Sequence, residues 1–137
     1  MTREMLLPLP IAKARAMSLE NHLALVAMRT SRGNVDLMSC LLKAVYLAWF
    51  LLDDPTAEQL RVFRDAEAAL ERSTTYAERN EGWAVPEEDC KAIEQILVLH
   101  DQQLGSLASH RYTSAWERLT QFIASPQRSP LPEPELA

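Results

Sequence analysis

The chain has 137 residues, 47% of them hydrophobic, and a formal net charge of −5. This length suits one domain that buries roughly two-thirds of its unfolded surface. The three glycines leave little turn chemistry for a multi-stranded sheet, and two cysteines are too few for a disulfide scaffold. We therefore expect an all-α protein with free thiols, located in the reducing cytoplasm.

The charge is unevenly distributed along the chain. Residues 1–52 carry six Lys and Arg against three Asp and Glu, whereas residues 53–137 carry eight against sixteen. Affinity for nucleic acid comes mainly from neutralising phosphates, so the acidic part argues against broad attachment to nucleic acid. The basic part leaves a local contact open.

Residues 1–9 predict an irregular arm, and residues 10–30 have the spacing of a helix. Ser18 could start a separate helix, so one kinked helix and two short ones both remain open. We expect a broad apolar stripe of this segment to face the core: Ile11, Met17, Leu19, Leu23, Val26 and Ala27. Residues 31–34 predict a corner, where Asn34 suits the N-cap of the next helix.

The segment 35–52 ends in an unbroken apolar run from residue 44 to residue 52. A helix that is apolar all round must be covered by protein or by lipid. Asp36 and Lys43 interrupt the segment, and its fully apolar part is about half the roughly 20 residues of a membrane span. We therefore expect protein to cover it.

Three further helices follow. Thr56 and Gln59 predict a capping box at the start of the first, the acidic residues 87–89 start the second, and the third covers about residues 112–124. The proline-rich residues 125–137 predict an extended or disordered tail. Short connections favour antiparallel neighbours, so residues 10–124 predict a compact up-and-down bundle of four to five helices.

The central apolar helix also gives a candidate interface. Asp36, Ser39 and Lys43 share one face, which turns apolar further along at Tyr46 and Phe50. Either later helices of the same chain cover that half, or a second copy does in a symmetric homodimer. The predicted partner or dimer interface consists of Tyr46, Leu47, Trp49 and Phe50.

Four residues have the atom types of a zinc site or a Cys–His nucleophile pair: His22, His100, Cys40 and Cys90. Each lies on a different predicted helix, and no short paired spacing occurs. We expect His100 to be a core histidine with one hydrogen bond, and buried thiols to have a raised pKa. No catalytic residue, metal or cofactor is predicted.

The sequence therefore favours a small non-enzymatic protein-binding module, an adaptor, inhibitor or accessory regulator. It would act by occlusion or scaffolding, through the aromatic face or the acidic helices, and as a homodimer with no membrane contact. The alternative is a nucleic-acid-associated transcriptional regulator. Its contacts would centre on the corner near a helix N-terminus, which suits anions, and would use Lys13, Arg15, Arg29 and Arg32.

Overall fold

The computed structural model describes residues 2–80 and 82–133 and contains six helices over these ranges. They are α1 (Arg3–Leu6), α2 (Ile11–Arg29), α3 (Val35–Phe50), α4 (Ala57–Arg79), α5 (Glu87–Ser106) and α6 (Ser109–Ala124). The all-α class is confirmed. The helix count exceeds the expected four to five because the arm contains the single-turn helix α1.

The arm is attached to the start of α6. The backbone N–H of Ser109 donates to the carbonyl of Leu7 at 2.7 Å, and the Ser109 hydroxyl donates to the carbonyl of Glu4 at 3.0 Å. Pro8 and Ala108 also form an isolated β-bridge. These bonds satisfy backbone groups that an irregular segment would otherwise leave to water.

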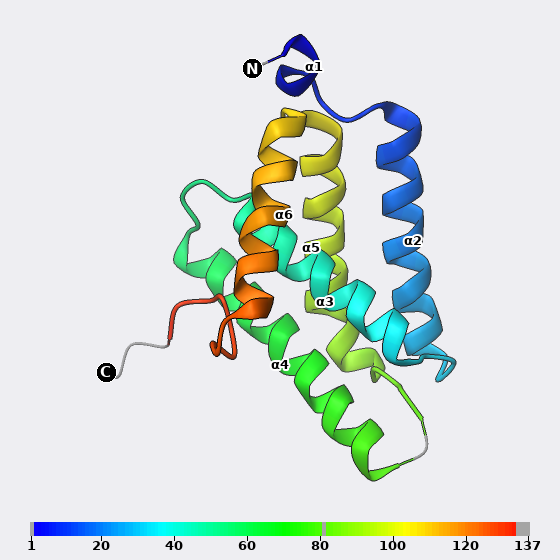
Figure 1. Cartoon of the computed structure of the whole chain (residues 1–137). Helices are drawn as coiled ribbons and strands as arrows, with labels where there is room; N and C mark the ends of the chain where they lie inside the picture. Colours follow the sequence, from blue (N-terminus) through cyan, green and yellow to red (C-terminus); the bar gives the residue numbers. More distant parts are fainter. Residues whose placement is uncertain (1, 81, 134–137) are drawn as a thin grey trace.

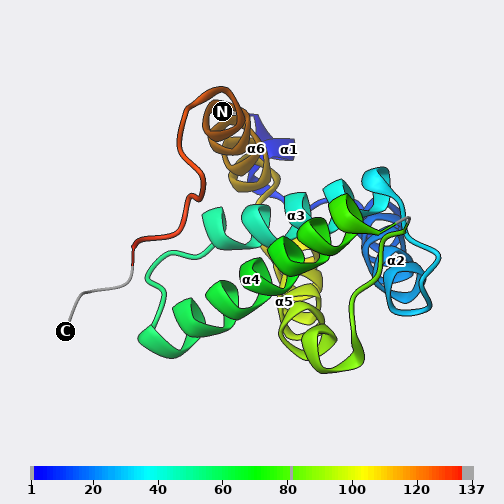
Figure 2. The same cartoon turned by 90° about the horizontal axis from the view of Figure 1, so that it is seen from below.

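Helix α3 occupies the centre of the fold and contacts α2, α4, α5 and α6 (Figures 1 and 2). Figure 1 shows the axes of α2, α5 and α6 roughly parallel, with α5 running in the opposite sense to the other two, and α3 and α4 crossing them obliquely. The arrangement therefore differs from the expected simple up-and-down bundle. The oblique crossing lets α3 pack against neighbours on several sides at once.

The local signals for the helix starts are confirmed. The Asn34 side chain accepts a hydrogen bond from the Leu37 N–H at 2.9 Å, and Thr56 and Gln59 form the capping box. The five consecutive residues 44–48 of α3 are all buried, so polypeptide surrounds this helix as expected. Within the described residues, no helix has the length and apolar character needed to cross a membrane.

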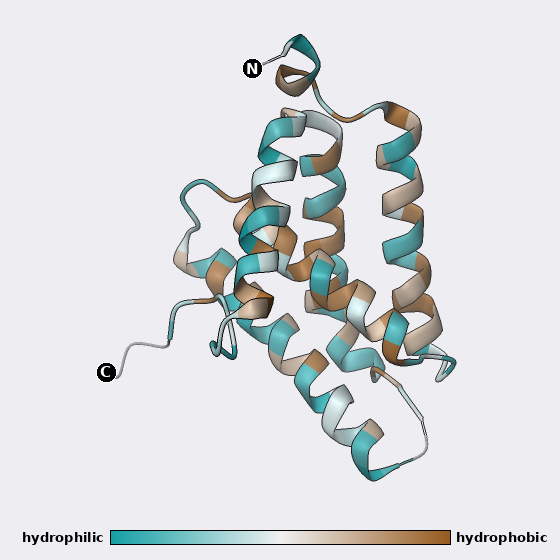
Figure 3. Cartoon of the chain, viewed as in Figure 1, coloured by the Kyte–Doolittle hydropathy of each residue, from teal (hydrophilic) through white to brown (hydrophobic). Residues whose placement is uncertain are grey.

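Helix α2 is one uninterrupted helix, which decides between the two forms left open by Ser18. Its buried residues are Ala24, Leu25 and Met28. The expectation that its broad apolar stripe faces the core is wrong for four members, which are exposed: Ile11, Leu19, Leu23 and Val26. Figure 3 shows apolar residues along α2 as well as along the central helix.

The segment after α6 packs against α4 over its described part, residues 125–133. Leu131 is only 7% exposed, the Ser129 hydroxyl donates to Glu67 Oε2 at 2.6 Å, and Arg64 Nη2 donates to the Pro132 carbonyl at 2.8 Å. The sequence predicted an extended or disordered tail, and residues 125–133 instead contact α4 through Ser129, Leu131 and Pro132. Residues 134–137 lie outside the described ranges.

The corner between α2 and α3 is closely packed around Gly33. Gly33 pairs with Trp83 in an isolated bridge, and a Cβ at Gly33 would collide with Met28 Sδ and lie 3.0 Å from the Trp83 carbonyl oxygen. Since Met28 is fully buried, we expect Gly33→Ala to lower the free energy of unfolding by about 1–3 kcal/mol. Urea unfolding followed by circular dichroism measures this change.

Gly105 provides the matched control. A Cβ there meets nothing within 4 Å, and Gly105 lies in the last turn of α5. Alanine is the better helix former, so Gly105→Ala should leave the stability unchanged or raise it by up to about 1 kcal/mol. Equal effects of the two substitutions would contradict the proposed crowding at Gly33.

Candidate functional site

The aromatic half of α3 is covered by helices of the same chain. Tyr46 and Leu47 are 5% and 4% exposed. The Tyr46 hydroxyl donates to Glu67 Oε2 of α4 at 2.7 Å, and its ring meets Phe122 of α6 edge-on at a centroid distance of 5.4 Å. The sequence left two interpretations of this face open, and the structure agrees with the one in which later helices of the same chain bury it. Tyr46 and Leu47 are therefore not available to a partner.

Trp49 and Phe50 are partly buried. Trp49 packs edge-to-face on Phe63 of α4 with ring centroids 5.4 Å apart. The Arg118 guanidinium of α6 lies over the Phe50 ring, 4.7 Å from its centroid, and Arg118 Nη1 donates to the Phe50 carbonyl at 3.3 Å. A cation over an aromatic face is a stabilising contact, so these side chains too are engaged within the chain.

The four basic residues of the nucleic-acid hypothesis do not form one patch. Arg29 faces two carboxylates of α5, with Nε 3.2 Å from Glu87 Oε2 and Nη2 3.5 Å from Glu94 Oε2. Arg32 is exposed beyond the end of α2, whereas Lys13 and Arg15 are exposed near its start, roughly 20 Å away along the helix.

The largest unexpected feature is the outward face of α2, which we call the α2 seam. Leu19, Leu23 and Val26 are 60%, 55% and 49% exposed, and Ala12 and Ala16 continue the same exposed face. Figures 1 and 2 show α2 at the margin of the molecule, with α3 and α5 on its inner side.

The spacing of the seam was a signal available in the sequence. Positions 12, 16, 19, 23 and 26 are separated alternately by four and three residues, which is the a and d pattern of a coiled coil. The sequence interpretation grouped Leu19, Leu23 and Val26 with the core instead. In the structure α2 buries the opposite face, so the heptad positions face outward.

Two charged residues flank the seam. Arg15 lies on one side and Glu20 on the other, both exposed. Neither forms an ion pair within 4 Å among the described residues. On the Arg15 side, His22 Nε2 lies 2.8 Å from Asp101 Oδ2 of α5, so that side of α2 is fastened to α5.

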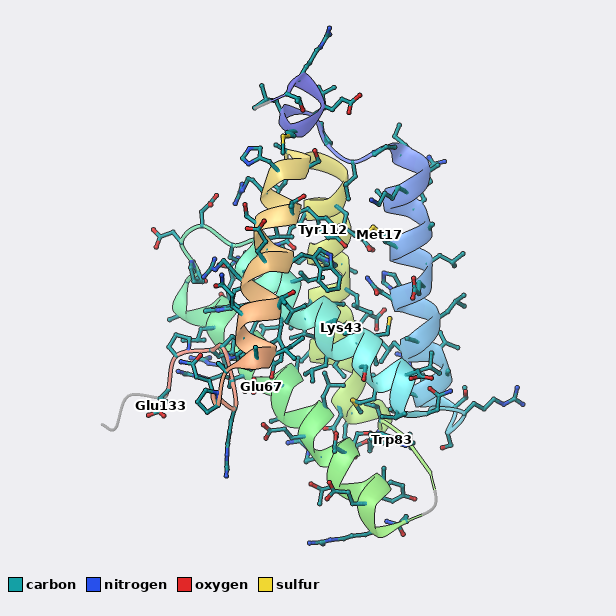
Figure 4. The ribbon with its side chains drawn as sticks, viewed as in Figure 1. Met17, Lys43, Glu67, Trp83, Tyr112 and Glu133 are labelled. Carbon is teal, nitrogen blue, oxygen red and sulfur yellow. The ribbon has the colours of Figure 1, made fainter. Side chains whose placement is uncertain are left out.

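A polar groove of about 610 Å³ lies on the other side of α2, between α2, α3, α5 and α6. Its walls include Met17, Lys43 and Tyr112, which Figure 4 shows on three of these helices. Cys40 also lines it, with its thiol donating to Asn21 Oδ1 at 3.4 Å. Burial raises the pKa of the Cys40 thiol, which favours the protonated, weakly nucleophilic form.

His100 lies at the bottom of this groove and is 1% exposed. Its Nδ1 is 2.9 Å from Gln103 Oε1, and Gln103 Nε2 donates to the Ala48 carbonyl at 3.0 Å. Because that second bond fixes the amide orientation, the Gln103 Oε1 atom accepts a hydrogen bond from the Nδ1–H group of His100. Burial lowers the pKa of His100, and the expectation of a core histidine with one hydrogen bond is confirmed.

The four residues weighed for a metal or nucleophile site do not converge. Cys40 and His100 line the same groove, His22 pairs with Asp101, and the Cys90 thiol donates to the Val85 carbonyl at 3.7 Å. Burial also raises the pKa of the Cys90 thiol. Over residues 2–80 and 82–133, no group of three or more His, Cys, Asp or Glu side chains is placed to hold a metal ion.

Comparisons of the chain with protein-family models, with curated proteins and with solved structures find no match. The chemistry and geometry of the surface are therefore the basis for a functional proposal.

Glu67 holds two elements together, because its Oε2 accepts from both Tyr46 and Ser129. Glu67→Ala leaves the buried Tyr46 hydroxyl without its acceptor, so the free energy of unfolding should fall by about 1–3 kcal/mol. It also releases Ser129, and trypsin should then cleave after the exposed Arg128 faster than in the wild type. Mass spectrometry of a timed digest measures the cleavage.

The exposed Glu71, one turn further along α4, is the control. Glu71→Ala should change stability by no more than about 0.5 kcal/mol and leave the cleavage rate at Arg128 unchanged. If both variants behave alike, Glu67 does not anchor the segment after α6.

The pKa of His100 gives a prediction about pH. The unfolded chain protonates this imidazole below pH about 6.5. In the folded chain burial lowers the pKa of His100, and the hydrogen bond to Gln103 and the charge of Asp101 oppose that shift only in part. The unfolded state therefore binds more protons there, and stability should fall as the pH drops from about 7.5 to 5.5. His100→Gln should reduce this fall, measured by urea unfolding at both pH values.

His110→Gln is the control, since His110 is only partly buried and has no hydrogen bond from its ring within the described residues. This variant should keep the pH dependence of the wild type. An unaltered pH dependence in His100→Gln would show that other groups cause it.

Proposed function

We propose that this protein is a protein-binding module that receives a helix of its partner along the α2 seam. The observation that carries the proposal is the exposed heptad spacing of Leu19, Leu23 and Val26. Amphipathic helices are recognised by apolar anchors at such spacings. A contiguous apolar face on a small domain is typical of an interaction surface.

Neighbouring apolar residues extend the seam. Val98 of α5 is 48% exposed. It lies between Glu94, which pairs with Arg29 of α2, and Asp101, which pairs with His22 of α2. A hollow of about 550 Å³ borders the seam and is lined in part by Ile11, Leu19 and Gly105. This surface can accept side chains from a helix packed against α2.

The exposed seam residues contribute part of the energy of such a contact. Burying a large aliphatic side chain completely contributes roughly 1.5–3 kcal/mol, and the three largest seam residues are each about half exposed. Their burial therefore contributes a few kcal/mol before the costs of association. Such a module would act as a scaffold or would occlude the partner's helix.

This proposal moves the interface from α3 to α2 and is better supported than the nucleic-acid alternative. Glu87 and Glu94 already face Arg29, and the remaining basic residues are divided between the two ends of α2. A phosphate backbone would find no continuous basic stripe along this helix.

Paired affinity captures from the native host test the proposal. The wild type should retain proteins that a Leu19→Asp, Leu23→Asp double variant loses, because a buried unpaired carboxylate is costly at an apolar interface. Quantitative mass spectrometry of the two eluates measures the difference. Both substituted side chains are exposed, so the variant should keep the circular dichroism spectrum of the wild type.

Ile123→Asp is the matched control, because Ile123 is an exposed apolar residue of α6 away from the seam, 61% exposed. It should retain the same proteins as the wild type. Retention of identical sets by all three proteins would refute a role of the α2 seam in binding.

A further inference from the structure

We propose that the helix received by the α2 seam is α2 of a second copy, aligned parallel and in register to form a two-stranded coiled coil. This inference rests on the proposed function and adds the identity and orientation of the partner. It follows from the positions of the charged residues beside the seam.

The heptad register assigns every position of α2. Ala12, Leu19 and Val26 take d positions, and Ala16 and Leu23 take a positions. The e positions beside them are Lys13, Glu20 and Ala27, and the g positions are Arg15, His22 and Arg29. Residues at e and g determine which partner and which orientation a coiled coil adopts.

In a parallel pair, a g residue faces the e residue five positions further along the other helix. Arg15 of one copy therefore faces Glu20 of the other, and the two-fold symmetry repeats this pair. His22 faces the uncharged Ala27, so no like charges meet across the parallel seam. Arg15 and Glu20 are exposed and unpaired within the described chain, which leaves both available.

An antiparallel pair places like flanks together, e against e and g against g. Glu20 would then meet Glu20, and Arg15 would lose its contact with Glu20 of the other copy. Like charges facing each other oppose association. The charge pattern therefore selects the parallel orientation.

The apolar positions and the shape of the molecule fit the same pair. Two-fold pairs are the commonest closed assemblies, and the small residues Ala12 and Ala16 let the N-terminal halves approach closely. The buried residues of α2, Ala24, Leu25 and Met28, lie opposite the seam, so the two domains would lie on opposite sides of the paired helices.

The contact is short, which sets the expected strength. Helix α2 has 19 residues and is roughly 28 Å long, so a single helix pair buries less than the about 1,200 Å² of a standard stable interface. We therefore expect a reversible dimer whose formation depends on protein concentration.

Sedimentation equilibrium on a charge-exchange series tests the pairing. Arg15→Glu and Glu20→Arg should each weaken self-association by roughly tenfold, because each replaces two attractive pairs with two repulsive ones. The double variant should recover the association of the wild type. Both residues are exposed, so each variant should unfold at the temperature of the wild type.

Mixing the two single variants gives a second readout. Arg15→Glu carries acids at both positions and Glu20→Arg carries bases at both, so the mixture should form a heterodimer more strongly than either variant associates alone. Equal association of all variants, or a wild type that stays monomeric up to about 0.3 mM, would overturn the proposal.

Oxidative cross-linking tests the orientation. Ala12→Cys should form an intermolecular disulfide, because a parallel pair places the two copies of position 12 together, whereas an antiparallel pair places them at opposite ends. Ile123→Cys on α6 should not cross-link and controls for random collision. Absence of the Ala12→Cys disulfide in a dimeric sample would overturn the parallel register.

These results separate this inference from the proposed function. A monomeric wild type whose host proteins are still lost on Leu19→Asp, Leu23→Asp substitution would reject the second copy and keep the seam as a binding surface. A monomeric wild type with no seam-dependent capture would reject both.

Discussion

The fold depends on the need to bury a helix that is apolar on every side. Residues 44–48 of α3 are consecutive and all buried, so no single neighbouring helix can cover them. Helices α2, α4, α5 and α6 all contact α3, and the oblique crossing in Figure 1 places them around it. The need to bury α3 determines the position of α2, which covers one side of α3. Helix α2 uses only part of its own apolar surface for this contact.

The Tyr46 hydroxyl and the His100 imidazole next to this core are paired, which makes their burial tolerable. Tyr46 reaches Glu67, and His100 is joined through Gln103 to the Ala48 carbonyl of α3. The Glu67 bond also ties the segment after α6 to α4 through Ser129. These bonds connect α3 to α4 and α5 with directional contacts that hydrophobic packing alone does not provide.

The α2 seam results from the same arrangement. Helix α2 has apolar residues on two faces, and the fold needs only the face that contains Leu25 and Met28. The remaining apolar residues stay in contact with water, in an alternating spacing suited to another helix. Leu19 and Leu23 leave more than half of their surface in contact with water within the single chain, whereas a partner helix would bury that surface.

The sequence by itself determined the helical class, most helix boundaries, the Asn34 cap, the capping box at Thr56 and the burial of α3, because these follow from local hydrogen bonding and from total apolar content. It also predicted His100 as a core residue. Only the tertiary structure decided which face of α2 points inward. Both apolar faces of α2 have helical spacing in the sequence, and the neighbouring helices determine which of them is buried. The same holds for the cover over Tyr46 and for the groove at His100, which combine residues from helices far apart in the chain.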